Sequence, residues 1–183
     1  MIYLEPPLSE ATIAGLHAGD RVLLRGTIYV ARDAAHKRMV ASLAEGAPLP
    51  FDPHGQVIYY MGPSPARPGR PIGSAGPTTS VRMDGYTEAM LKAGVKATIG
   101  KGERGPAVRQ ALQQYKAVYL VAIGGAGALL AQSIRAAEVV AYPELGPEAL
   151  RRLTVVDFPV IVGCDTYGQD IYQTGREPYR RRP

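Results

Sequence analysis

The chain has 183 residues, which is the usual length of one domain. Hydrophobic residues make up 46% of it and charged residues 20%, a balance that supports a buried core and excludes a disordered chain. The one cysteine, Cys164, excludes an intrachain disulfide, a four-cysteine zinc site and an iron–sulfur cluster held by this chain alone.

The formal net charge of +5 is concentrated at the C-terminus. Residues 176–183 include four arginines and one glutamate, a net +3, which leaves +2 for the other 175 residues. A nearly neutral body does not favour nucleic acid as a partner. The N-terminus has neither the basic start nor the continuous apolar run of a secretory signal, so we expect a cytoplasmic chain that is not bound to a membrane.

The first half of the chain reads as a β-rich start followed by a long loop. Apolar spacing and turn residues predict a short helix between Ser9 and Gly19, a strand over 21–30, a helix over 33–43 capped by Asp33, and a strand over 57–60. Residues 62–77 contain five prolines and four glycines, which excludes a helix or a central strand there. We predict a long ordered loop or a lid over this segment.

The second half alternates between helix and strand patterns. The predicted elements are a helix from Thr78 or Thr79 to Lys92, a strand over 96–99, a helix over 107–114, and short strands over 139–142 and 160–162. Residues 117–134 carry no charge and are just long enough for a membrane helix, but the glycines at 124–127 divide them into a buried strand and a helix. The whole pattern predicts a single α/β domain.

Arg32 is the first residue that suggests an anion site. It leaves the end of a predicted strand just before the helix cap Asp33, so its guanidinium would lie beside the free N–H groups of the helix start. Together these groups bind a carboxylate or a phosphate. A surface arginine beside an ordinary capped helix explains the same residues. His36, in the first helical turn, is predicted to be a hydrogen-bonding group rather than a catalytic one.

A second candidate follows the long loop. Pro77 stiffens the approach, the hydroxyls of residues 78–80 can cap a helix, and Arg82 comes four residues after Thr78, which would place both on one helical face. Hydroxyl, guanidinium and backbone N–H groups would then converge. An ordinary capped helix with a solvated Arg82 and Asp84 fits these residues as well.

A third candidate is the turn at residues 100–105, which has the spacing GxGxxG between a strand and a helix. This pattern is typical of dinucleotide sites, which also need an acidic residue about twenty positions further on. The next strand ends at Ile123 and two glycines, with no acid. What remains is Lys101 on a glycine turn, either reaching an anion or simply solvated.

Other catalytic patterns have little support. His17, His36 and His54 lack metal-ligand spacing, and there is no Gly-x-Ser-x-Gly elbow, so the sequence does not predict a self-contained metalloenzyme or a serine hydrolase. The tyrosines, including those at 59–60, are predicted to pack in the core.

The candidate segments occur in an order and spacing that resemble the β subunit of the class I iron–sulfur hydro-lyases, the fumarate hydratase and tartrate dehydratase family. The matching stretches are residues 26–37, 49–52, 55–63, 76–84, 101–102, 124–131 and 144–149, leading to 157–159. The block Gly-Pro-Thr-Thr-Ser-x-Arg-Met-Asp at 76–84 is the specific one.

The resemblance implies the architecture and the partners of the chain. It implies a swivelling β/β/α-type domain over residues 1–172, with a mixed sheet and flanking helices, followed by a basic tail over 173–183. It also implies an α subunit that binds a 4Fe-4S cluster through three cysteines, so that this chain holds no metal or cofactor. Two α and two β chains are expected to assemble.

The resemblance also assigns roles to site residues. Arg32, Arg82 and Lys101 would bind the carboxylates of a dicarboxylate substrate, and Thr78 would take part in removing a proton from carbon, helped by an acidic residue of the α subunit. The implied reaction is the reversible hydration of fumarate to malate, inactive without the α subunit. An L-tartrate dehydratase β subunit and a non-catalytic anion-binding module are the alternatives.

Overall fold

The computed structural model of the chain describes residues 1–180. Its elements, in chain order, are β1 (Ile2–Leu4), α1 (Glu10–Ala14), β2 (Arg21–Val30), α2 (Asp33–Ala44), β3 (Val57–Tyr59), the 3-10 helix η1 (Ser80–Met83), α3 (Asp84–Lys92), β4 (Ala97–Gly100), α4 (Pro106–Gln114), β5 (Val118–Val121), α5 (Gly127–Ala131), β6 (Ile134–Ala141), the 3-10 helix η2 (Pro143–Glu148), β7 (Leu150–Cys164), α6 (Ile171–Thr174) and the 3-10 helix η3 (Glu177–Tyr179). The strand predicted over 21–30 is confirmed, and residues 62–77 form a loop without helix or named strand, as predicted.

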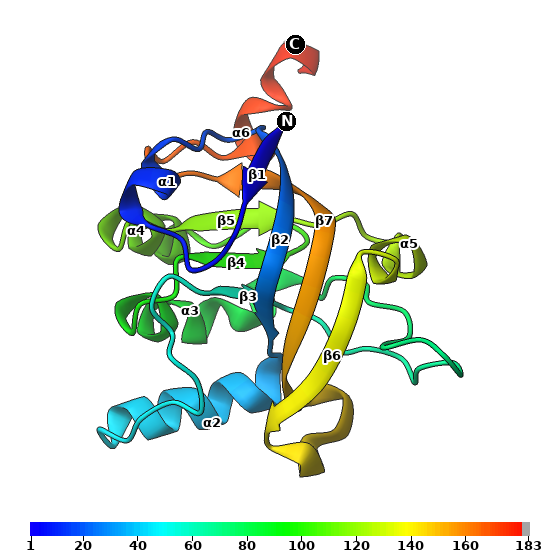
Figure 1. Ribbon diagram of the computed structural model, residues 1–183. Coiled ribbons are helices and arrows are strands. Elements are labelled where there is room, and N and C mark those ends of the chain that lie inside the picture. The colour runs from blue at the N-terminus through cyan, green and yellow to red at the C-terminus, as the bar shows by residue number, and fades with distance from the viewer. Residues whose placement is uncertain (181–183) are drawn as a thin grey trace.

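One mixed sheet organises the chain. Strands β1 to β5 pair in parallel in chain order, whereas β7 is antiparallel to β5, to β6 and to β2. Because β7 pairs with both β2 and β5, the sheet closes on itself. Helices α2, α3 and α4 cover the outer face of its parallel part, and α5 lies on the opposite side (Figure 1). The prediction of a single α/β domain with a mixed sheet and flanking helices is confirmed.

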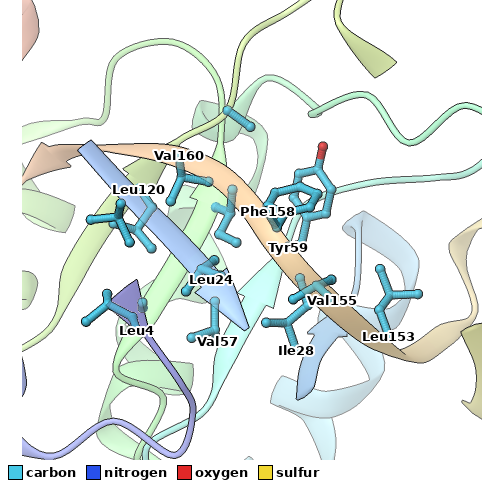
Figure 2. Packing of buried hydrophobic residues seen from close by; sticks show 14 of the residues in the cluster. Leu4, Leu24, Ile28, Val57, Tyr59, Leu120, Leu153, Val155, Phe158 and Val160 are labelled. Atoms are coloured by element: carbon cyan, nitrogen blue, oxygen red, sulfur yellow. The ribbon is translucent and has the colours of Figure 1, made fainter. Parts of the chain in front are cut away.

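Two layers of apolar side chains stabilise this arrangement. Inside the closed sheet, side chains from β1, β2, β3, β5 and β7 point toward one another (Figure 2), among them Leu4, Leu24, Ile28, Val57, Tyr59, Leu120, Leu153, Val155, Phe158 and Val160. The second layer lies between the sheet and helices α2, α3 and α4, and Tyr60 and Tyr119 belong to it. Tyr59 and Tyr60 are fully buried, so the prediction that they pack in the core is confirmed.

Strands β6 and β7 are much longer than the short strands predicted over 139–142 and 160–162. The alternation of buried residues in β7 changes phase at Asp157, which has a left-handed φ of 54°. There Val156 and Asp157 lie opposite Arg25 of β2 alone, which is a β-bulge. The bulge interrupts the period of two by which a strand is recognised, and for this reason the sequence pattern reveals only the end of β7.

The segment predicted as one helix from Thr78 or Thr79 to Lys92 is in fact η1 followed by α3. The uncharged run 117–134 is divided as predicted, into β5, a glycine turn and α5, although α5 ends at Ala131 and Ile134 already belongs to β6. Over the described residues, no helix has the length and apolar character needed to cross a bilayer. Helix α6 spans the predicted boundary at residue 172, and the last three residues of the predicted tail lie outside the described residues.

Candidate active site

The four residues implied by the resemblance meet at one edge of the sheet. Arg32 follows β2 and Lys101 follows β4, while the Thr78 amide donates to the Tyr60 carbonyl just after β3, at 2.7 Å. These strands are parallel, so their carboxyl ends lie at the same edge, where open α/β sheets commonly bind ligands. Arg82 lies in η1, four residues after Thr78.

Asp33 joins the two arginines. Arg82 Nε donates to Asp33 Oδ1 at 3.0 Å, and Arg32 Nη2 lies 3.5 Å from Asp33 Oδ2. The prediction that Asp33 caps α2 is wrong: Arg32 occupies the cap position without a side-chain capping bond, and Asp33 is the first helical residue. The Asp33 carboxylate therefore neutralises part of the charge of both guanidinium groups and keeps them close together.

Glu148 is a site residue to which the sequence analysis gave no role. Its Oε2 accepts a hydrogen bond from the Ala34 amide at 2.8 Å, and its Oε1 lies 3.4 Å from Arg32 Nη2. The carboxylate thus caps α2 from η2, more than a hundred residues further along the chain. Within residues 1–180, Arg32 Nε is buried and has no hydrogen-bond partner, so this guanidinium keeps donor capacity that the described residues leave unused.

Thr78 and Lys101 are joined through their backbones. The Lys101 amide donates to the Thr78 carbonyl at 3.2 Å, and the Ser80 amide donates to the Lys101 carbonyl at 2.9 Å. Two predictions about this segment are wrong. Thr79, at the cap position of η1, makes no side-chain capping bond, and Thr78 precedes the helix, so Thr78 and Arg82 do not share a helical face. Backbone hydrogen bonds to Tyr60, after β3, and to Lys101, after β4, position Thr78 instead.

Lys101 extends over the turn that follows β5. A Cβ atom on Gly124 would lie 3.3 Å from Lys101 Cδ, so the glycine leaves room for the lysine stem. Lys101 is exposed, as a group that binds a soluble anion must be. The glycine turn predicted from the sequence therefore has a second glycine turn beside it, which comes from the next parallel strand.

His36 supports the start of α2 from the inside. It is buried, and its Nδ1 lies 2.9 Å from the Arg32 carbonyl oxygen. Burial lowers the pKa of the His36 imidazole to about 4, so the ring is neutral near pH 7 and its Nδ1–H donates to that carbonyl. The aromatic rings of Tyr60 and Tyr86 enclose it, with centroids 5.4 and 6.0 Å away. His36 thus has the first-turn hydrogen-bonding place that the sequence suggested.

The described residues do not form a site for a metal ion. Among residues 1–180, no group of three or more His, Cys, Asp and Glu side chains is arranged to hold a metal ion. Cys164 is buried at the end of β7, and burial raises the pKa of its thiol to about 12, which keeps the thiol protonated near pH 7.

The arrangement is a set of cations, Arg32, Arg82 and Lys101, with a hydroxyl group at Thr78, at the carboxyl edge of a parallel sheet. Two or three cations on separate loops suit a small anion with charge at both ends, since each carboxylate can meet its own guanidinium or ammonium group. The fold and the site together define an α/β domain with three cations and a hydroxyl group at the carboxyl edge of its parallel strands.

Comparison with known proteins gives the family. The family model described as Fumarase C-terminus matches residues 1–175, and the chain belongs to this family. The chain is 40% identical over 174 residues to the anaerobic class I fumarate hydratase of Escherichia coli, a match that covers 93% of this chain and 32% of that protein. Over 156 residues it is 41% identical to fumarate hydratase 2 of Leishmania major, with 84% of this chain and 28% of that protein covered.

A relative of similar length is the putative L(+)-tartrate dehydratase subunit beta of Methanocaldococcus jannaschii. The two are 38% identical over 179 residues, which is 94% of this chain and 92% of that protein. By contrast, the chain spans about a third of the length of the fumarate hydratases it matches. The resemblance identified from the residues is confirmed, and the relatives place the chain in a family of hydro-lyases.

Proposed function

We propose that this chain is the β subunit of an iron–sulfur-dependent hydro-lyase that reversibly hydrates fumarate to malate. The observation that carries the proposal is the joining of Arg32 and Arg82 through Asp33, beside the backbone pair formed by Thr78 and Lys101. This places three cations and a hydroxyl at one sheet edge, and the family relatives include fumarate hydratases.

In this proposal the chain's own residues bind and orient the substrate. Arg32, Arg82 and Lys101 take the two carboxylates of the dicarboxylate, and holding both ends of a small flexible acid supplies much of the rate gain. Thr78 faces the carbon that loses or gains a proton. A free threonine hydroxyl is far too weak a base for that step, so an acidic residue of the partner must assist it.

The proposed partner is an α subunit that holds a 4Fe-4S cluster. When bound there, the cluster would supply a Lewis acid for the hydroxyl group that leaves as water. We further propose that two α and two β chains assemble, and that this chain is the swivelling β/β/α domain of the complex, inactive by itself. The M. jannaschii relative, whose name describes a subunit, supports a separate β chain.

The test measures fumarate formed from malate by its ultraviolet absorbance, under anaerobic conditions. The chain is assayed with and without a class I α subunit that carries a reconstituted cluster. Turnover is expected only with the α subunit. The Arg82→Met variant should lower kcat/KM by about 100-fold or more, because a charge-assisted contact to a carboxylate is lost. Arg135→Met, on an exposed position of β6, is the matched control and should change it little. Turnover by the chain alone would refute the two-subunit proposal.

L-tartrate dehydration is a second candidate, favoured by the name of the M. jannaschii relative. Tartrate is therefore the second substrate in the same assay, and the preferred acid identifies the reaction. Binding of malate without turnover of either acid, despite an intact cluster and a stable complex, would favour a non-catalytic anion-binding module.

A further inference from the structure

The GxGxxG turn at residues 100–105 has a structural explanation that is unrelated to nucleotide binding. A Cβ atom on Gly100 would overlap Ser80 Oγ, and one on Gly105 would lie 2.9 Å from Asp84 Oδ2. Gly102 has a left-handed φ of 82°, which favours glycine. The three glycines therefore allow the turn after β4 to pack directly on the segment 78–84, which carries Thr78 and Arg82.

Arg104 is buried where these two segments meet. Its side chain is fully shielded from solvent, and its Nε donates to Asp84 Oδ1 at 2.8 Å. Its other nitrogens donate to Thr98 Oγ1 at 3.2 Å and to Thr87 Oγ1 at 2.6 Å. The second carboxylate oxygen of Asp84 accepts from the Gly105 amide at 2.8 Å. A buried charge held by so many partners fixes the relative position of the turn and the start of α3.

Tyr119 of β5 extends the same network toward the site. Its hydroxyl donates to the Gly102 carbonyl at 2.9 Å and lies 2.9 Å from Ser80 Oγ. Burial raises the pKa of this hydroxyl above its ordinary value, so it stays protonated. The Arg104 guanidinium lies over the Tyr119 ring, 4.9 Å from its centroid. The turn is thus held on both sides of Glu103, by Tyr119 at the Gly102 carbonyl and by Arg104, which anchors it to Asp84.

We propose that Arg104 is a positioning residue, which sets the place of Lys101 relative to Arg82 and Thr78 through Asp84 and Tyr119. Lys101 is three residues before Arg104, and Arg82 is two residues before Asp84, so a displacement of the Arg104–Asp84 pair moves both cations apart. The inference rests on the proposed function, because it assumes that these cations bind one dicarboxylate.

The test uses the full chain, labelled with 15N, and L-malate as the probe. Binding of malate and hydrogen exchange of the amides of Ser80, Lys101 and Gly105 are followed by NMR at a temperature well below the melting temperature of each variant. Arg104→Met should weaken malate binding at least tenfold and speed the exchange of these amides at least tenfold. Arg104→Lys should show an intermediate loss, because an ammonium cannot hold three partners in a planar fork.

Two further variants keep the test decisive. Tyr119→Phe removes one hydroxyl with little change of volume, so it should fold even if Arg104→Met does not, and it should weaken malate binding about threefold. Lys96→Met removes a half-buried cation at the other end of β4, where it contacts Glu10 and the Tyr115 carbonyl, and should leave malate binding unchanged.

The outcomes separate the two proposals. Faster amide exchange with native malate affinity would show that Arg104 only stabilises the fold, and native exchange with native affinity would show that it does neither; both overturn the inference. Absence of malate binding by the wild-type chain would count against the proposed function, and the exchange data would still decide whether Arg104 holds the two segments together.

Discussion

The wild type should lose about 2 kcal/mol of its free energy of unfolding between pH 7 and pH 5 because of His36, and replacing His36 by glutamine should abolish this loss. The native pKa of His36 is about 4 and the ordinary value is 6.5, so between these values the unfolded chain binds a proton that the folded chain excludes. The stability that comes from keeping His36 neutral is therefore fully present above pH 6.5, and it is lost as the pH drops toward 4. A shift of this size corresponds to about 3 kcal/mol in total, of which about 2 kcal/mol is lost between pH 7 and pH 5.

The structural cause is the buried position of His36. Protonation would place a charge in the first turn of α2, at the positive end of the helix dipole and near the buried Arg104 guanidinium. The Nδ1–H bond to the Arg32 carbonyl and the nearby Asp33 carboxylate favour the protonated ring, but they offset only part of the cost of burying the charge.

The assay is urea unfolding followed by circular dichroism at pH 5, 6 and 7, with wild type and His36→Gln compared at each pH. The difference between their free energies of unfolding should shrink by about 2 kcal/mol as the pH falls, because the wild type alone loses the His36 contribution. His17→Gln, at an exposed position, is the matched control and should keep the wild-type dependence. An equal pH dependence for wild type and His36→Gln would refute the reasoning.

Three other predictions, one of them with a control variant, test the core and one helix. Tyr59→Phe removes the buried hydrogen bond from the hydroxyl to the Ala75 carbonyl, at 2.5 Å, and should lower the free energy of unfolding by about 1–2 kcal/mol, measured in urea. Phe158→Ala, fully buried in the closed sheet, should cost about 3–5 kcal/mol by the same measurement, whereas Val156→Ala, 38% exposed on the same strand, should cost less than about 1 kcal/mol; similar costs at both sites would contradict the packing described. Gly85→Ala, within α3 and with open space around the added methyl group, should raise the melting temperature through a gain of up to about 1 kcal/mol, and a lower melting temperature would argue against that helix.

Local sequence patterns determined much of the secondary structure of this protein. Strand β2, the proline- and glycine-rich loop over 62–77 and the division of residues 117–134 could all be predicted, because each depends on nearby residues. Through the family resemblance, the motif order also predicted Arg32, Thr78, Arg82 and Lys101 as candidate site residues, and the structure brings all four to one edge of the sheet.

The tertiary structure alone decided which groups these residues meet. Strand β1 and the full lengths of β6 and β7 depend on pairing between segments far apart in the chain, and the bulge at Asp157 hides the period of β7. In the same way Asp33 became a link between two arginines rather than a cap, and Glu148 supplied the cap from a distance of 114 residues. A local pattern records a residue's own conformation and exposed side, whereas the partner of a charged side chain is fixed only when the sheet closes and brings distant segments together.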